Sequence, residues 1–390
     1  MSPCKKSILE LCAVEFTYVQ FLSGLASRLT RSGWQVTAAF SSSCPDETSI
    51  RLNQDSVRFS NVNVYRSIKP GKLIKSLISL TQLLRHSNSF IIHVHTPIVS
   101  YITRLIYNIC RYKSSKLVCT VHGYYFHSQS NTLTFVLHYL AELALTRPNH
   151  YYFFVSKEDY EFASKYLPVS SERSFYVGNG VDTQLFYPYD SKKSQRVRRN
   201  NGFADDDIVI GFAGRLVKEK GLIELLQAFS ILSRVIPELK LLICGDTLES
   251  DYDTSLSYLI RKSIAGSRHR IVATGMVASK IDLIDYYNCM NIFCLPSYRE
   301  GLPTSLLEAM SCGLPSVTTD VRGCNELIEH GKTGLLVQTK NSQSLASALH
   351  RLITDTNLRT LLGDRARRNV VSSYNLDDLL RRQEEILSLI

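Results

Sequence analysis

The sequence predicts an α/β protein built from two Rossmann-like, doubly wound domains. Short β-rich runs alternate with helix-length segments along both halves of the 390-residue chain, and domains of about 150 residues make two large ones the simplest division. The 44% of hydrophobic and 21% of charged residues are ordinary for a globular protein and exclude a disordered one. Such alternation implies parallel sheets with helices on both faces.

In the first half, the predicted strands are KKSILELCAV, WQVTAAF, FIIHVHT, KLVCTVH and YYFFV. The predicted helices between and after them cover residues 17–32, 70–85, 101–112, 133–145 and 157–167. Ser156 followed by Asp159 has the spacing of a capping pair, which begins the last helix.

In the second half, the predicted strands are DIVIGFAG, LKLLICG, RIVATG, NIFCLPS and PSVTT. The predicted helices cover 221–232, a segment from about 252, 280–287 and 305–312. A turn at Asn179-Gly180 and the polar run SKKSQRVRRNNG predict a boundary near 179–194. We therefore expect domains over 1–182 and 183–375, with an amphipathic helix at 376–390 that packs back on the first domain.

Positive charge is concentrated in the first half. The formal net charge is +10, and residues 56–141 hold ten basic residues and no carboxylate. The ten are Arg58, Arg66, Lys69, Lys72, Lys75, Arg85, Arg104, Arg111, Lys113 and Lys116. A positively charged surface of this kind could bind an anionic membrane or nucleic acid, or it could simply be exposed to solvent. Nucleic acid is disfavoured because no aromatic platform is interleaved with the charges.

Apolar runs, the N-terminal residues and the cysteines indicate in which cellular compartment the protein works. No run approaches 18 uninterrupted apolar residues, and no small-residue cleavage site follows the N-terminus, so neither a transmembrane helix nor a signal peptide is expected. Ten cysteines include no C-x-x-C pair, and Cys244 and Cys294 lie in apolar runs. Both features are typical of reduced core cysteines in a cytosolic protein.

The first candidate site is YREGLPTSLLE, residues 298–308, where a predicted strand passes through a loop into a helix. Backbone N–H groups at a helix start lack intrahelical partners and can bind an anion. Gly301 lets a ligand approach the backbone, while Glu300 and Glu308 stand on either side of the helix start. The two carboxylates suit a ligand that has hydroxyl groups on both sides of a phosphate. The alternative is that the segment is an ordinary turn followed by a helix with a solvated glutamate.

The second candidate is GFAGRLVKEKG, residues 211–221, in which a strand ends at Gly214 and two cations follow. Arg215 and Lys220 could clamp a diphosphate, or they are solvated surface cations. The spacing is not G-x-G-x-x-G, so no nicotinamide cofactor is predicted.

His122, at the end of a predicted strand, could donate to a sugar hydroxyl, accept a proton, or serve only structure. His93 and His95 share one strand face, but no Asp or Glu lies in the surrounding region and no third ligand is evident. No metal site is therefore predicted there.

Three further motifs are weak. Asn179-Gly180-Val181-Asp182 is typical of a turn whose backbone could border a ligand. Asp251-Tyr252-Asp253 has the spacing of a metal motif but lies in a polar stretch, where we expect solvated carboxylates. The run 330–333, HGKT, is not a Walker motif because Glu326 occupies the place of its first glycine.

Together, GRLVKEKG and SYREGLPTSLLEAMSCGLPSVTTDVRGCNELIEHGKTGLLV resemble the retaining family 4 glycosyltransferases of the GT-B fold. The Glu300-x7-Glu308 pair is the most specific part. NGVDTQLF, VHGYYFH, HVHTP and FVSKEDYEFA are similar to the branch that builds bacterial capsular polysaccharide, lipopolysaccharide and exopolysaccharide. Many members carry a Gly-Gly loop after the first strand, whereas residues 14–17 here read VEFT, a segment that we expect to shape the acceptor side.

The resemblance implies a hexosyltransferase-type reaction without metal or cofactor. A sugar would pass with retention from a nucleotide-diphosphate sugar, a UDP-sugar being favoured, to a hydroxyl of a glycan acceptor, often carried on a polyprenyl diphosphate. The first domain would serve the acceptor and the second the nucleotide sugar. The enzyme would work at the cytoplasmic face of the membrane as a peripheral protein.

The resemblance also assigns residues. Gly214, Arg215 and Lys220 would hold the diphosphate, Glu300 would contact the donor sugar, and His122 would line the donor-sugar and acceptor side.

The remaining assignments concern the donor's other groups. The backbone of Gly301, Leu302 and Pro303 would lie beside sugar and phosphate, Glu308 would bind the ribose, and Val277 would contact the base. Three alternatives stay open: a sugar-nucleotide epimerase on the same fold, a non-catalytic nucleotide-sugar-binding protein, and a nucleic-acid-binding protein.

Overall fold

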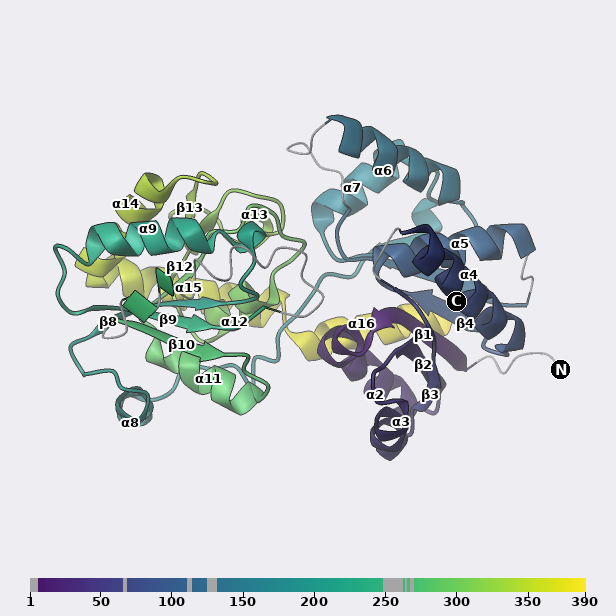
Figure 1. Cartoon of the computed structure of the whole chain (residues 1–390), viewed down its shortest axis with the longest axis horizontal. Helices are drawn as coiled ribbons and strands as arrows, with labels where there is room; N and C mark the ends of the chain where they lie inside the picture. The colour runs from purple at the N-terminus through teal and green to yellow at the C-terminus, as the bar shows by residue number, and fades with distance from the viewer. Residues whose placement is uncertain are drawn as a thin grey trace. The chain divides into compact units, whose positions relative to one another are not determined.

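The chain folds into two α/β units, each with one parallel sheet (Figure 1). The computed structural model describes residues 6–65, 69–110, 114–124, 132–247, 262–263, 265–266 and 270–390, without the side chain of residue 134. Unit 1 comprises Met1–Gly178 and Asp378–Ile390, and unit 2 comprises Asn179–Asp377. The predicted fold class is confirmed.

Unit 1 contains a seven-stranded sheet in the order β3-β2-β1-β4-β5-β6-β7. The strands are β1 (Ser7–Val14), β2 (Gln35–Ser41), β3 (Arg58–Asn61), β4 (Ile91–Val94), β5 (Lys116–Val121), β6 (Tyr151–Phe154) and β7 (Ser174–Tyr176). The short edge strands β3 and β7 were not predicted. RFSN, the sequence of β3, carries only one apolar residue because an edge strand need not be buried on both faces.

The helical segments of unit 1 are α1 (Glu15–Thr17), the π-helical turn η1 (Tyr18–Leu22), α2 (Ser23–Arg31), α3 (Pro45–Gln54), α4 (Pro70–His86), α5 (Pro97–Cys110), α6 (Thr132–Leu145), α7 (Lys157–Tyr166), the 3₁₀ turn η2 (Ser171–Arg173) and α16 (Leu376–Leu389). The prediction of one regular helix at 17–32 is wrong, because η1 interrupts it. The predicted cap is confirmed: the Ser156 side chain accepts a hydrogen bond from the backbone N–H of Asp159.

Two cores cover the faces of the unit 1 sheet. On one face α4 and α5 pack over Leu11, Ile92 and Leu117. On the other, α2 and the C-terminal helix α16 pack over Ile8 and its neighbours. Leu387 of α16 is buried in that second core, and Glu384 pairs with Arg28 of α2 at 2.7 Å.

Unit 2 contains a six-stranded sheet in the order β10-β9-β8-β11-β12-β13. The strands are β8 (Ile208–Ala213), β9 (Leu239–Cys244), β10 (Ile271–Gly275), β11 (Ile292–Leu295), β12 (Ser316–Thr319) and β13 (Leu335–Val337). β11 is buried along its whole length, as expected of a central parallel strand covered on both faces. Cys244 and Cys294 are buried, as their apolar surroundings predicted.

The described helical segments of unit 2 are α8 (Ser191–Asn200), the 3₁₀ turn η3 (Lys218–Lys220), α9 (Leu222–Leu232), α11 (Lys280–Cys289), α12 (Thr304–Ser311), α13 (Cys324–Leu327), α14 (Ser342–Thr354) and α15 (Thr356–Ser373). The helix predicted from about 252 and the motif at 251–253 lie outside the described residues.

The polar run near the predicted boundary contains a helix, α8, which was not predicted. The Asp190 side chain caps it, accepting from the backbone N–H of Lys193 at 2.9 Å. Arg198 is buried and donates to the carbonyl of Cys289 at 2.7 Å, so this charged residue anchors α8 to unit 2.

Both sheets reverse their order at one point, between β1 and β4 in unit 1 and between β8 and β11 in unit 2. In open parallel sheets, ligands bind outside the carboxyl ends of the strands at such a switch point. Among the described residues, no helix combines the length and the apolar character that a bilayer-crossing segment requires.

Candidate active site

An ion pair between Lys220 and Glu300 lies at the switch point of unit 2. Lys220 ends the turn η3 after β8, and Glu300 follows β11, the neighbouring strand. The Lys220 Nζ lies 2.6 Å from the Glu300 Oε1. The same oxygen accepts from the hydroxyl of Ser297 at 2.6 Å. Two predicted site residues are thus brought together, and Ser297 is a partner that the sequence reasoning missed.

The two loops that carry this pair are tied to each other. The backbone N–H of Tyr298 donates to the carbonyl of Glu219 at 2.7 Å. The Tyr298 hydroxyl donates to Glu224 of α9 at 2.6 Å. Gly221 makes the close approach possible: its φ is +67°, and a Cβ there would lie 1.9 Å from the carbonyl oxygen of Pro296.

The segment Gly301-Leu302-Pro303 leads into α12. Leu302 is buried, and its carbonyl accepts from the side-chain amide of Asn179 at 3.2 Å. Asn179 therefore anchors this loop through its side chain. The turn predicted at 179–182 is not formed, and Val181 instead makes a β-bridge with Asn375. The N-cap residue Pro303 makes no side-chain cap, which leaves the first N–H groups of α12 without a capping side chain.

Glu308 lies in the second turn of α12 and is buried. Its Oε2 accepts from the hydroxyl of Tyr287, on α11, at 2.8 Å. Burial raises the pKa of Glu308 to about 7, although the Tyr287 hydrogen bond and the charge of Lys280 act to lower it. This carboxyl can therefore exchange a proton near neutral pH.

The remaining predicted residues of unit 2 follow β8 and β10. Gly214 and Arg215 follow β8, and the backbone N–H of Gly214 donates to the carbonyl of Cys244 at 2.9 Å. Val277 follows β10, two strands from β8 in the sheet, and is half-buried. No described contact joins Val277 to Lys220, Glu300 or Glu308.

His122 lies in unit 1, directly after β5, and is partly buried. Its Nε2 lies 3.3 Å from the Nδ1 of His95. Burial, and then the neighbouring histidines, lower the pKa of His122 to about 3. The ring is therefore neutral at pH 7.

The sequence reasoning missed Glu10. It found no carboxylate near His93 and His95, but Glu10 on β1 is the direct register partner of His93. The Glu10 carboxylate lies 2.7 Å from the Nε2 of His95 and 3.2 Å from the Nδ1 of His93. A signal did exist, because a lone glutamate inside the apolar strand SILELCAV has to find a buried partner.

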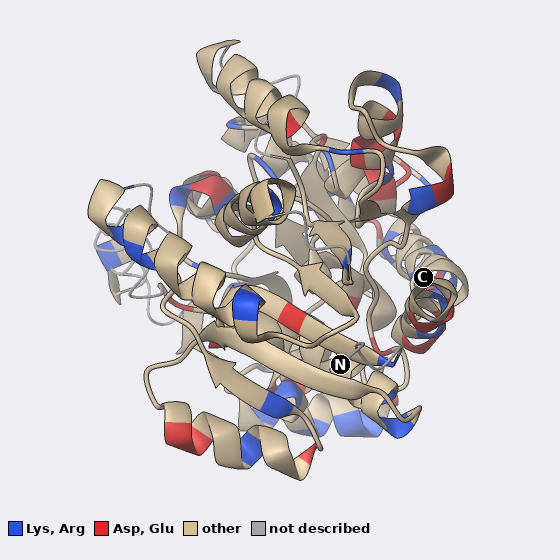
Figure 2. Cartoon of the chain, turned by 90° about the vertical axis from the view of Figure 1, so that its right-hand side faces the viewer, with Lys and Arg blue, Asp and Glu red and all other residues tan. Residues whose placement is uncertain are grey.

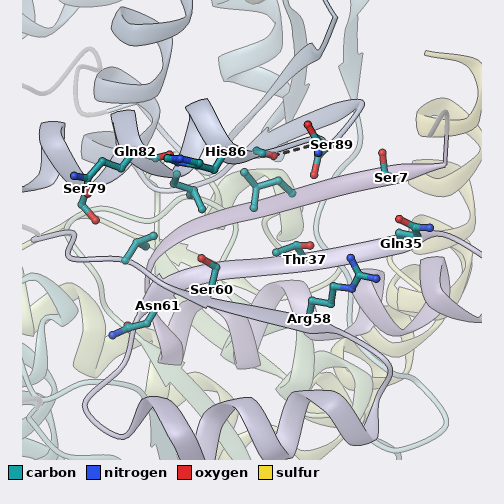
Figure 3. Close-up of a pocket in the computed structure, with 15 residues that line it drawn as sticks. Ser7, Gln35, Thr37, Arg58, Ser60, Asn61, Ser79, Gln82, His86 and Ser89 are labelled. Atoms are coloured by element: carbon teal, nitrogen blue, oxygen red, sulfur yellow. Dashed lines mark hydrogen bonds between the residues drawn. The ribbon is translucent and has the colours of Figure 1, made fainter. Parts of the chain in front are cut away.

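A separate cavity of about 520 Å³ lies in unit 1 beside α4 (Figure 3). Hydroxyl and amide side chains from β1, β2, β3 and α4 line much of it, among them Ser7, Gln35, Ser60 and Gln82. None of the predicted site residues belongs to this lining.

Two protein families match the chain. "Glycosyl transferases group 1" matches residues 193–369, and "Glycosyltransferase Family 4" matches residues 19–185. The chain is a glycosyltransferase of the GT-B fold. These matched ranges contain Lys220, Glu300 and Glu308 in the first case and His122 in the second.

Individual glycosyltransferases match along most of the chain. The putative glycosyltransferase EpsD of Bacillus subtilis is 25% identical over 372 residues, 94% of this chain and 92% of its own. The UDP-Gal:alpha-D-GlcNAc-diphosphoundecaprenol alpha-1,3-galactosyltransferase of Escherichia coli is 27% identical over 86% of this chain and 84% of its own. The structure of Anabaena HepE with UDP and glucose superposes with a TM-score of 0.79, covering 99% of this chain and 100% of HepE at 19% identity.

Proposed function

We propose that this glycosyltransferase transfers a sugar, with retention and without a metal ion, from a nucleotide-diphosphate sugar to a hydroxyl of a lipid-linked glycan acceptor. We favour a UDP-sugar and a role in bacterial surface polysaccharide synthesis. The E. coli relative is named for a UDP-sugar donor and a diphosphoundecaprenol-linked acceptor. The observation that carries the proposal is the Lys220–Glu300 pair at the switch point of unit 2.

The proposed role of Lys220 follows from its chemistry. An ammonium group has three N–H donors, and the described contact with Glu300 uses one of them. With Arg215 and the N–H groups at the start of α12, it would neutralise the charge that develops on the departing diphosphate. Such preorganised cations and amides stabilise a transition state most strongly where water is excluded.

Glu300 and Glu308 would bind the two hydroxyl-bearing ends of the donor. Glu300, held by Lys220 and Ser297, would accept hydrogen bonds from the donor sugar. Glu308, when ionised, would accept them from the ribose. Val277 would contact the base, and the backbone of 301–303 would lie beside sugar and phosphate.

The proposed transfer occurs on one face of the sugar. The bond from the anomeric carbon to the phosphate oxygen breaks, and a bond from the acceptor oxygen to that carbon forms on the same side. The acceptor's hydroxyl proton passes to the departing phosphate oxygen, so the products are a nucleoside diphosphate and the extended glycan. His122, in unit 1, would hydrogen-bond a sugar or acceptor hydroxyl.

A lipid-linked acceptor requires approach to a membrane, and three neighbouring helices of unit 1 present a suitable surface. We define the α4–α6 surface by its exposed large apolar residues, which are Leu73, Ile74, Leu77, Ile78, Leu105, Ile109, Leu133, Val136, Leu137, Leu140 and Leu143. α5 packs against both α4 and α6, so the three helices are adjacent.

Charge supports the same surface. Lys72 and Lys75 are exposed on α4, and Figure 2 shows basic residues and no acidic ones along that helix. The one carboxylate of α6, Glu142, is buried and paired with Arg104 at 2.7 Å. Exposed leucines and lysines without acidic residues are typical of a helix that lies at an anionic lipid interface.

Donor hydrolysis tests the proposed function most directly. The purified protein is incubated with UDP-, GDP- and ADP-sugars, with and without a lipid-linked acceptor. Slow release of one nucleoside diphosphate, accelerated by the acceptor, is expected. Interconversion of the sugar nucleotide without an acceptor would instead establish an epimerase, and binding without any turnover would contradict catalysis.

A further inference from the structure

Five polar side chains form a hydrogen-bonded series across three strands of unit 1. Glu10 stands on β1, His93 on β4 with His95 just past its end, and Thr120 on β5 with His122 just past its end. Glu10 and His93 are register partners, and residues two apart along a strand share a face. The series runs Thr120–His93–Glu10–His95–His122.

The cluster at the centre of this series is sealed from solvent. Glu10 and His93 have no exposed surface, and His95 is 2% exposed. The carboxylate stands between Ile8 and Cys12 on the same face of β1, both fully buried. A buried carboxylate is costly, and an apolar residue would often stabilise such a position better. The retention of charge here therefore points to a role beyond packing.

The contact distances favour hydrogen bonds over a metal centre. Zinc ligands at their usual bond lengths of about 2.1 Å stand about 3.4 Å apart in a tetrahedral site. The Glu10 carboxylate and the His95 Nε2 are 2.7 Å apart, which is a hydrogen-bond distance.

The carboxylate decides where every proton in the series lies. An ionised carboxylate can only accept, so the Nε2 of His95 must carry the hydrogen that it donates to Glu10. A neutral His95 then has a bare Nδ1. The Nε2 of His122, 3.3 Å away, must in turn donate to that Nδ1. The Nδ1 of His122 is left as an acceptor.

The electrostatics agree with these protonation states. Burial would raise the pKa of Glu10, but His93 and the hydrogen bonds of both histidines lower it to about 2. Burial, and then His93, lower the pKa of His95 to about 4. At pH 7 the carboxyl is ionised and the His95 ring is neutral.

We infer that Glu10 is a positioning residue that acts through His95 to hold His122 in the tautomer with its hydrogen on Nε2. His122 then presents Nδ1 as an acceptor for a substrate hydroxyl at the carboxyl end of β5. This inference rests on the proposed glycosyl transfer for its functional consequence, but not for the tautomer itself.

The tautomer is measured directly by NMR of the full-length protein with ¹⁵N-labelled histidine rings. We expect His95 and His122 to carry hydrogen on Nε2 alone at pH 7. A His122 with hydrogen on Nδ1, or a cationic ring, would overturn the inference. Because the Glu10 Oε2 lies within 3.1 Å of the His93 Nδ1 and 2.7 Å of the His95 Nε2, a glutamine amide oxygen could still accept from both rings. Glu10→Leu removes the acceptor of both, so a changed tautomer at His95 or His122 is expected; an unchanged tautomer in both rings would also overturn the inference.

Steady-state kinetics distinguish a positioning role of His95 from a purely structural one. His95→Ala removes the acceptor for the Nε2 hydrogen of His122, and we expect kcat to fall roughly 10-fold or more with the donor KM changed less than about threefold. His95→Asn places an amide oxygen near the former Nδ1 and should restore part of kcat. Thr120→Val, at the far end of the series, is the matched control and should leave the His122 tautomer and kcat unchanged. If His95→Asn is no faster than His95→Ala, or if Thr120→Val is as slow as His95→Ala, the inference that Glu10 positions His122 through His95 is contradicted.

Two further readouts keep the outcomes distinct. Thermal melting of each variant establishes that it is folded. The zinc content of each purified protein is also measured. One zinc ion per wild-type chain that is lost in Glu10→Gln would show that Glu10, His93 and His95 form a metal centre, and would overturn the proposed hydrogen-bonded series. If the wild-type protein has the expected tautomers but turns over no nucleotide sugar, only the proposed function is refuted. If it turns over a nucleotide sugar but has other tautomers, only the positioning role of Glu10 is refuted.

Discussion

Lys220 and Glu300 are 80 residues apart in sequence, yet the Nζ of one lies 2.6 Å from a carboxylate oxygen of the other. The contact joins the loops that follow β8 and β11, the two strands at which the order of the unit 2 sheet reverses. A cation and an acid held together at this place can serve the phosphate and the sugar of one donor.

Removal of either member of this pair should abolish turnover. We expect Lys220→Ala and Glu300→Ala each to lower kcat at least ~100-fold, because each would remove a contact that strengthens in the transition state. Lys218→Ala, which removes an exposed cation of the same 3₁₀ turn, is the matched control and should stay close to wild type. Near-normal turnover in Lys220→Ala or Glu300→Ala would contradict the assigned site.

Glu308 should make the stability of the protein depend on pH. Its pKa is raised from 4.5 to about 7 in the folded state, so the folded protein holds an extra proton between these values. The stabilisation from Glu308 is complete below pH 4.5 and is lost as the pH rises towards 7. We expect the decrease in Tm from pH 5 to pH 8 to be smaller in Glu308→Gln than in wild type. Glu329→Gln, at an exposed position, should behave as wild type.

The same titration should affect donor binding. An ionised Glu308 accepts two hydrogen bonds from ribose hydroxyls more strongly than a protonated one. The affinity for UDP, measured by calorimetry, should therefore rise as the pH increases through about 7. The rise should be absent in Glu308→Gln. An affinity that falls over this range in wild type would contradict the ribose contact.

Gly221 should tolerate no side chain. Its φ of +67° disfavours other residues, and a Cβ would lie 1.9 Å from the Pro296 carbonyl oxygen. We expect Gly221→Ala to lower the free energy of unfolding by roughly 1–3 kcal/mol or more, measured by denaturant titration. Gly71→Ala, in the first turn of α4 with no atom within 4 Å of the new methyl group, should be close to neutral. Equal stability of the two variants would refute this account of the turn.

The α4–α6 surface should bind anionic vesicles. Flotation should recover the wild-type protein with vesicles that contain anionic lipid and much less of it with neutral ones. Lys72→Glu with Lys75→Glu should reduce the anionic binding, and Leu137→Ser with Leu140→Ser should reduce binding to both.

A charge control for that experiment exists on unit 2. Lys192 and Arg196 are exposed on α8, and their replacement by Glu changes the net charge by the same amount as the two α4 substitutions. This variant should float like wild type. If it loses binding as strongly as the α4 variant, net charge rather than the α4–α6 surface determines attachment.

Much of the unit 2 site was predictable because its signals are local. A strand, a Gly-Leu-Pro loop and a helix follow one another within 298–308, so the position of Glu300 and Glu308 at the start of a helix is set by neighbouring residues. The cap at Ser156 is local in the same way. α8 was missed because only Val197 and Arg198 of its ten residues are buried, and Arg198 is held by carbonyl groups that lie outside the helix.

The sequence by itself determined the fold class, the glycosyltransferase family and the loops that carry Lys220, Glu300 and Glu308, because periodicity and short motifs are properties of adjacent residues. Only the tertiary structure decided that Lys220 meets Glu300, that Glu308 is buried against Tyr287, and that Glu10 lies beside His93. The first and third contacts depend on which strands become neighbours and in what register, and the second depends on how α11 packs beside α12. No short motif specifies sheet pairing across 80 or more residues: the lone glutamate in SILELCAV shows that Glu10 needs a buried partner, but not which residue it is.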